Sequence, residues 1–209
     1  MKRKVIAGIL IALGLAVMSV PLYFKITGSQ KSDEMIERFE HMVEQETVTE
    51  HEEEKEDCGQ EETEATISEE DAATLAKEEV IGLIEIETLD IKYAVMEGTG
   101  NHELSCGIGH ITDTAGIGEK GNCVLAGHNG SRHGTFFTNL KTSQTGEVVK
   151  LTDKEGNQYF YEVESMEVVG PYDNSVKDQG EEAELTLITC ENKGTMRLIV
   201  KCSMQEVVE

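Results

Sequence analysis

The sequence predicts an all-β domain, a closed or nearly closed β-barrel with one or two short helical turns, preceded by a single N-terminal transmembrane helix. Three features of the sequence indicate this architecture: an uncharged apolar run at the start, a long acidic stretch, and a last part in which runs rich in Ile, Val and Tyr alternate with Gly, Asn and Asp. The chain therefore divides into a membrane segment (1–28), a linker (29–79) and a folded domain (80–209).

The first segment has the length and polarity of a membrane-spanning helix. Residues 5–24 contain no charged side chain, and at a rise of about 1.5 Å per residue they match a hydrocarbon core of roughly 30 Å. A cleaved signal peptide would have a shorter apolar run followed by a small-residue cleavage site, which is missing here. Because Lys2, Arg3 and Lys4 precede the run, the positive-inside rule places the N-terminus in the cytoplasm and the remaining chain outside the cell.

The acidic charge is concentrated in the linker. The 209 residues carry 41 acidic and 18 basic side chains, a net charge of −23, which excludes a nucleic-acid binder that works by neutralising phosphates. Residues 29–79 hold 20 of the acids and 4 of the bases, a composition that buries too little apolar surface to fold alone. Met35, Phe39 and Val43 lie on one apolar stripe at helical spacing. We interpret this stripe as a short, transient helix.

Seven runs in the last segment have the composition of strands. They are rich in β-branched and aromatic residues and are separated by turn-forming residues; they cover residues 82–87, 91–96, 122–126, 147–152, 158–169, 184–190 and 196–202. Only one or two helical turns fit, near His102 and over residues 135–140. Seven or eight strands without a longer repeat favour the barrel.

The last two strands form a hairpin that brings reactive groups together. With its turn centred on residues 193–194, Cys190 lies directly opposite Arg197, with Cβ atoms about 4.5–5.5 Å apart. The alternation of side chains along a strand then places on the core face Leu185, Leu187, Leu198 and Val200. On the outer face, beside the thiol and the guanidinium, it places an apolar floor of Ile188 and Ile199. This arrangement suits a nucleophile in a shallow peptide groove.

A proton-transfer group completes the set. A thiol attacks as the thiolate, which a nearby cation favours, and the same cation can stabilise the oxyanion that forms when a carbonyl is attacked. His128 is the candidate base, because it follows the apolar strand 122–126 in a glycine-rich loop that leaves its ring accessible. Cys190, His128 and Arg197 are therefore the candidate catalytic residues.

These residues resemble the sortase family. Thr-Leu-Ile-Thr-Cys at 186–190 is followed by Arg197 and preceded by Leu-Ala-Gly-His at 125–128, and the resemblance extends over residues 81–200. It implies an eight-stranded β-barrel enzyme, anchored in the membrane of a Gram-positive cell with its catalytic domain extracellular. The implied reaction is cysteine transpeptidation: an LPxTG-like sorting signal is cleaved, and the protein is passed to an amine of peptidoglycan or of its lipid-linked precursor.

The resemblance also implies a role for each catalytic residue. Cys190 forms a thioester acyl-enzyme with the sorting signal. His128 protonates the leaving amine and later deprotonates the incoming one. Arg197 binds the substrate and supports the oxyanion together with the backbone N–H of Glu191.

The implied substrate-binding residues surround the nucleophile. They are Thr189, Glu191, Ile188 and Ile199, together with the loop over residues 170–184. This loop is too short for the helical insert of class B, and the D-P-aromatic lid of the pilin-assembling class C is missing from the sequence. The resemblance is therefore closer to class A or D.

Three other interpretations stay open. A zinc module would use Cys106 with His110 and Cys123 with His128. A catalytically silent extracellular β-barrel would only bind a partner. A hydrolytic cysteine protease of the same fold would let water, rather than an amine, resolve the acyl-enzyme.

No catalytic role is predicted for the remaining cysteines or for the acidic loops. Cys58, Cys106, Cys123 and Cys202 are interpreted as structural residues, and an oxidising compartment permits disulfides among them. No metal or other cofactor is expected, with calcium at the acidic loops around Asp113, Glu119, Glu181, Glu182 and Glu184 as the one candidate. We interpret His110 as structural, since it lacks the strand-end glycine setting of His128.

Overall fold

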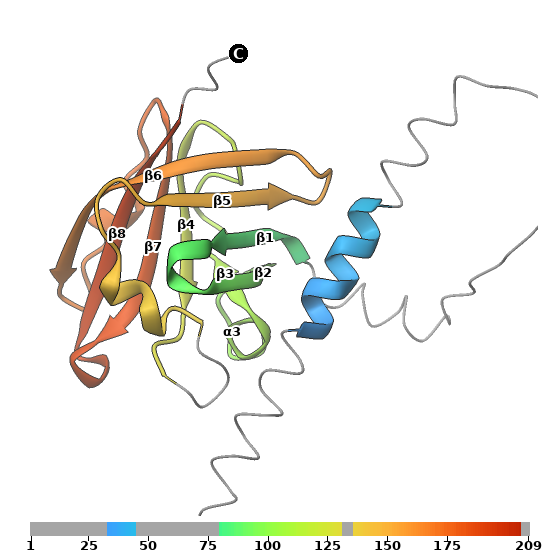
Figure 1. Ribbon diagram of the computed structural model, residues 1–209. Helices are drawn as coiled ribbons and strands as arrows, with labels where there is room; N and C mark the ends of the chain where they lie inside the picture. The colour runs from blue at the N-terminus through green and yellow to red at the C-terminus, as the bar shows by residue number, and fades with distance from the viewer. Residues whose placement is uncertain (1–32, 45–79, 131–135, 206–209) are drawn as a thin grey trace, which may run out of the picture.

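A closed barrel of eight strands dominates the structure, with the strand order β1-β2-β3-β4-β7-β8-β6-β5 (Figure 1). The structure is a computed structural model that describes residues 33–44, 80–130 and 136–205. It confirms the barrel predicted from the sequence. The predicted membrane span, residues 5–24, lies outside the described residues, and within the described ranges no helix is long and apolar enough to cross a bilayer.

The strands follow the predicted runs closely. They are β1 (Val80–Ile86), β2 (Ile91–Glu97), β3 (Ile108–His110), β4 (Gly121–Gly127), β5 (Val148–Asp153), β6 (Gln158–Val169), β7 (Ala183–Glu191) and β8 (Met196–Met204). The connections contain the short helices α3 (Glu103–Cys106), η1 (Glu87–Leu89), η2 (Thr138–Thr142), η3 (Ser175–Lys177) and η4 (Asn192–Gly194). The strand missed from the sequence is β3, because three residues are too few to show an alternating pattern.

The barrel interior is lined as the alternation predicted. Leu185 and Leu187 of β7 and Val200 of β8 are fully buried in one apolar cluster, which Leu198 joins. Two of the pairings in the barrel are parallel, β2 with β3 and β4 with β7. The second of these matters for the site, because it brings the carboxyl ends of β4 and β7 to the same edge of the barrel.

A helix over residues 33–44 packs on the outside of β1 and β2 (Figure 1). Met35 and Phe39 are buried there, 4% and 2% exposed, against Leu83, Ala94 and Met96. The expectation of a transient helix is therefore wrong: the apolar stripe has a partner. The partner surface arises only when β1 and β2 pair, so the linker composition could not reveal it.

Candidate active site

Cys190 and Arg197 face each other across β7 and β8. The predicted register of this hairpin is confirmed, and its loop contains the four residues 192–195. Asn192, Lys193 and Gly194 all have positive φ, at 48°, 57° and 90°, a conformation that Asn and Gly adopt at low cost. The thiol and the guanidinium are both half-buried, so each combines a fixed backbone with access from outside.

The guanidinium of Arg197 is oriented by the backbone of its own hairpin. Its Nη1 donates to the carbonyl oxygens of Gly194 at 3.0 Å and Met196 at 2.9 Å. Two bonds to one nitrogen fix the direction of the planar group. The positive charge is thereby held at the end of the hairpin that carries Cys190 and Arg197.

The parallel pairing of β4 with β7 brings His128 to the same place. Gly127 is the register partner of Thr189, and the residues that follow them are His128 and Cys190. The Thr189 hydroxyl, buried at 2% exposure, donates to the Gly127 carbonyl oxygen at 2.8 Å and ties the two strand ends together. Gly127 itself leaves no room for a side chain, since a Cβ there would lie 2.7 Å from the core ring of Phe137.

The loop after His128 is held by three hydrogen bonds. The His128 carbonyl oxygen accepts from the Phe137 amide at 3.0 Å. The next residue, Asn129, donates from its side-chain amide to the Cys190 carbonyl oxygen at 2.7 Å, and the Gly130 amide donates to the Thr138 hydroxyl at 3.0 Å. The His128 backbone is therefore fastened both to the core and to the strand that carries Cys190.

An aromatic ring packs beside the imidazole. The ring centroid of Phe136 lies 6.4 Å from that of His128 and 5.0 Å from that of Tyr93. Phe136 is 1% exposed, so this contact supports the histidine from the core side. Neither Phe136 nor Asn129 was identified from the sequence, because aromatic rings and asparagines in loops have no spacing that marks such a role.

The described cysteines differ sharply in accessibility. Cys106, Cys123, Cys190 and Cys202 are all free, and Cys190 alone among these four is half-buried rather than buried. Burial raises the pKa of the Cys123 and Cys202 thiols to about 12, so both stay protonated near neutral pH. The disulfides allowed by the sequence are not formed among these four residues, and Cys58 lies outside the described residues.

The apolar floor predicted beside Cys190 is not open to solvent, which corrects the expectation for Ile188 and Ile199. Ile188 is 9% exposed and Ile199 is fully buried. Both pack with Val124 of β4 and with Val176 of η3, in the connection between β6 and β7. The connection covers the outer face of β7 and β8, a contact that strand alternation alone does not include. Glu191, the last residue of β7, is half-buried beside Cys190.

The alternative metal ligands have other partners. His110 is buried and lies 3.1–3.2 Å by Nδ1 from the carboxylate oxygens of Glu97, as a structural residue would. Cys123 is in the barrel core whereas His128 follows the end of the strand. Across residues 33–44, 80–130 and 136–205, no three His, Cys, Asp or Glu side chains gather closely enough to hold a metal ion. The predicted zinc pairs therefore do not form a site.

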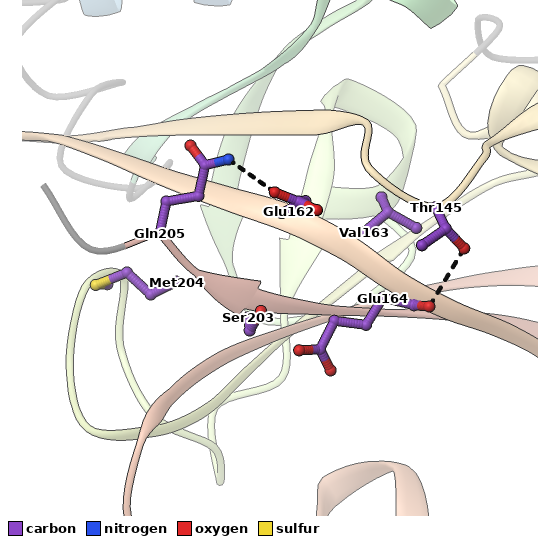
Figure 2. A pocket seen from close by; sticks show the side chains of 7 residues that line it. All are labelled: Thr145, Glu162, Val163, Glu164, Ser203, Met204 and Gln205. Carbon is purple, nitrogen blue, oxygen red and sulfur yellow. Dashed lines mark hydrogen bonds between the residues drawn. The ribbon is translucent and has the colours of Figure 1, made fainter. Parts of the chain in front are cut away.

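A pocket of about 650 Å³ lies away from these residues. Figure 2 shows its lining from β6, β8 and the neighbouring loops: Thr145, Glu162, Val163, Glu164, Ser203, Met204 and Gln205. In the β6–β8 pairing, Tyr161 lies opposite Met204 at this end, and Val169 lies opposite Arg197 at the other. The pocket thus lies at the opposite end of the β6–β8 pair from Arg197.

Comparison with known proteins gives a consistent result. Residues 84–205 match the sortase domain family. Sortase A of Bacillus anthracis is 33% identical over 110 residues, which cover 53% of this chain and 51% of that protein. Sortase D of Bacillus subtilis is 31% identical over 110 residues, covering 52% and 53%. The chain spans about half the length of the curated relatives it matches.

Solved structures show the same fold over a longer range. A Clostridium perfringens sortase D5 transpeptidase superposes with a TM-score of 0.63 and 27% identity, covering 85% of this chain and 99% of that one. Sortase E from Streptomyces avermitilis gives a TM-score of 0.55 and 30% identity, covering 61% and 89%. Because the family match extends over more than half of the sequence, the chain belongs to the sortase family.

Proposed function

We propose that this protein is a membrane-anchored cysteine transpeptidase that cleaves an LPxTG-like sorting signal and transfers the released protein to an amine of the cell wall. The observation that carries the proposal is the convergence of Cys190, Arg197 and the loop of His128 at one end of β4, β7 and β8. Membership of the sortase family supports this choice of reaction. The matches to sortases A and D fit the class A or D resemblance.

The proposed reaction uses the three side chains in turn. The Cys190 sulfur attacks the threonine carbonyl carbon of the signal, while Arg197 and the Glu191 backbone N–H stabilise the negative oxygen. The bond to the following glycine breaks, its nitrogen takes a proton from His128, and a thioester remains. An amine of peptidoglycan or of its lipid-linked precursor then attacks the thioester carbonyl, gives its proton to His128 and releases the sulfur.

Substrate binding is proposed along the surface next to the nucleophile. Glu191 borders the thiol, and Ile188 and Ile199 support the β6–β7 connection from beneath, through their packing with Val176. Thr189, expected from the sequence to contact the peptide, is buried and instead fixes the end of β7. We propose that the signal binds along the β6–β7 connection beside Cys190. The direction of β7 then carries the scissile bond to Cys190.

The location of the enzyme is proposed from the sequence. Residues 5–24 would anchor it in the membrane with the N-terminus in the cytoplasm and the barrel outside. Acyl transfer by a thiol, a base and a cation requires no cofactor. Calcium at the acidic loops stays a prediction, tested by comparing activity with calcium and with a chelator.

The test is mass spectrometry of the full chain, purified in detergent, after incubation with LPxTG-like peptides. The expected product is an acyl adduct on Cys190, lost in Cys190→Ala and kept in Cys106→Ala, whose thiol is buried. Amines of glycine, lysine or diaminopimelate should convert the adduct to a transpeptidation product. An adduct that survives Cys190→Ala, or no adduct with any peptide of the panel, contradicts the proposal. Release by water alone identifies a hydrolase.

A further inference from the structure

We propose that Asn122 is a positioning residue that holds η3 against β4, so that the β6–β7 connection lies in place over Ile188 and Ile199, beside Cys190, before any peptide binds. The inference rests on the proposed function and assigns a role at the opposite end of β4 from His128. It concerns the recognition of the signal rather than the bond-making steps.

The side chain of Asn122 is buried and uses both ends of its amide. Its Nδ2 donates to the carbonyl oxygens of Val176 at 3.0 Å and Asp178 at 3.3 Å, and its Oδ1 accepts from the Thr186 hydroxyl at 2.8 Å. Asn122 is 4% exposed and Thr186 3% exposed. Because the hydroxyl can only donate to Oδ1 in this arrangement, Thr186 directs the amide nitrogen toward the η3 carbonyls.

The backbone of Asn122 is bound by the same connection. The Asn122 amide donates to Gln179 Oε1 at 2.9 Å, and Gln179 Nε2 donates to the Asn122 carbonyl oxygen at 3.1 Å and to that of Lys177 at 2.9 Å. The Gln179 side chain thus makes with the Asn122 backbone the two hydrogen bonds that a neighbouring strand would make. Lys177 adds an exposed ion pair with Asp113 at 3.1 Å, which contributes little by itself. The buried amide is the principal fastening.

These hydrogen bonds determine where the β6–β7 connection lies. Val176 is 8% exposed and packs with Ile188, Ile199 and Val124. Ile188 precedes Cys190 by two residues on β7, so both lie on the same face of that strand. A connection that is already in place spares the peptide the entropy cost of ordering it. Loss of the Asn122 amide should therefore weaken peptide binding and leave the chemistry at Cys190 intact.

The first test compares Asn122→Ala with Asn139→Ala in the full chain. Asn139 is a matched control, because its Nδ2 also pins a loop carbonyl, that of Leu89, at 2.9 Å, away from Val176. We expect Asn122→Ala to raise the KM for the sorting peptide about tenfold, the effect of one lost buried hydrogen-bond set. The kcat and the rate at which iodoacetamide alkylates Cys190 should stay within about twofold. Equal KM values in both variants would overturn the proposal.

The second test needs no substrate. In and beside η3, the backbone amides of Lys177 and Asp178 donate to the carbonyl oxygens of Asn174 at 3.0 Å and Ser175 at 3.1 Å. The hydrogen exchange of these two amides should be faster in Asn122→Ala than in wild type or Asn139→Ala. Unchanged exchange would overturn the role of Asn122 even if the enzyme is active. Conversely, a wild-type chain that forms no acyl adduct refutes the proposed function while exchange still reports on Asn122. If Asn122→Ala does not fold, Asn122→Asp, which keeps the shape but loses the donor, serves in both tests.

Discussion

The side-chain amide of Asn129 donates a hydrogen bond of 2.7 Å to the carbonyl oxygen of Cys190, across 61 positions of the sequence. The residue after the proposed base is thereby bonded to the backbone of the proposed nucleophile. The relative position of the imidazole and the thiol depends on this bond as well as on the parallel strands. Three variants and one labelling experiment test the contacts of the site, the docked helix and the buried thiols.

Asn129→Ala should slow acylation of Cys190 by about fivefold, since one hydrogen bond that positions two reacting groups is worth about 1 kcal/mol. The thermal midpoint should barely change, because the bond is exposed. Single-turnover acylation measured by mass spectrometry checks this. Asn101→Ala, an exposed loop asparagine, is the control and should behave as wild type. An unchanged acylation rate in Asn129→Ala would show that the parallel strands alone fix the site.

Arg197→Lys should lower kcat/KM for the sorting peptide by roughly a hundredfold, because lysine cannot reproduce the planar guanidinium fork. The two carbonyl contacts of Nη1 show that the fork is held in one orientation. Steady-state kinetics provide the measurement. Lys201→Arg, four residues further along β8 and paired with Glu167, is the reciprocal control. If Arg197→Lys keeps full activity, a positive charge alone suffices.

Phe39→Ala should lower the free energy of unfolding by about 3 kcal/mol, or by less if the helix undocks first, because the ring is buried against β1 and β2. Glu40→Gln is the comparison. Its ion pair with Lys92, at 2.7 Å, is exposed and contributes about 0–1 kcal/mol. Urea unfolding of the full chain in detergent separates the two variants. Equal midpoints for Phe39→Ala and wild type would mean that the docked helix adds no stability.

Thiol labelling at pH 8 should modify Cys190 and spare Cys123 and Cys202. The pKa of each buried thiol is raised from 9.0 to about 12 by desolvation, so the folded state keeps both protonated while the unfolded chain ionises them above pH 9. Stability is therefore unaffected below pH 9 and falls as the pH rises from 9 toward 12. Peptide mapping after iodoacetamide treatment, with and without urea, provides the measurement. Rapid labelling of Cys202 without urea would contradict its burial.

Much of the site could be predicted from short stretches of sequence. The register of the last hairpin follows from alternation and from one turn, and the structure confirms Cys190 opposite Arg197. The glycine before His128 indicated a strand end, and β4 ends at Gly127. Such local rules work because each depends only on residues within one hairpin or one strand.

The contacts that the sequence did not reveal are those between distant segments. The covering of Ile188 and Ile199 by Val176 depends on how the β6–β7 connection folds back. The docking of Phe39 depends on a surface made by two other strands. Neither surface exists until the barrel has formed, so spacing alone could not identify the partner residues.

The parallel pairing of β4 with β7 has a consequence for the order of folding. In the sequence, β5 and β6 lie between β4 and β7. His128 and Cys190 therefore come together only when this crossover is complete. Contacts of such long sequence separation form late and slowly, because the closure entropy of the intervening chain must first be overcome. A partly folded chain therefore has Cys190 without His128 beside it. In the proposed reaction, peptide cleavage therefore requires a molecule in which β4 and β7 have already paired.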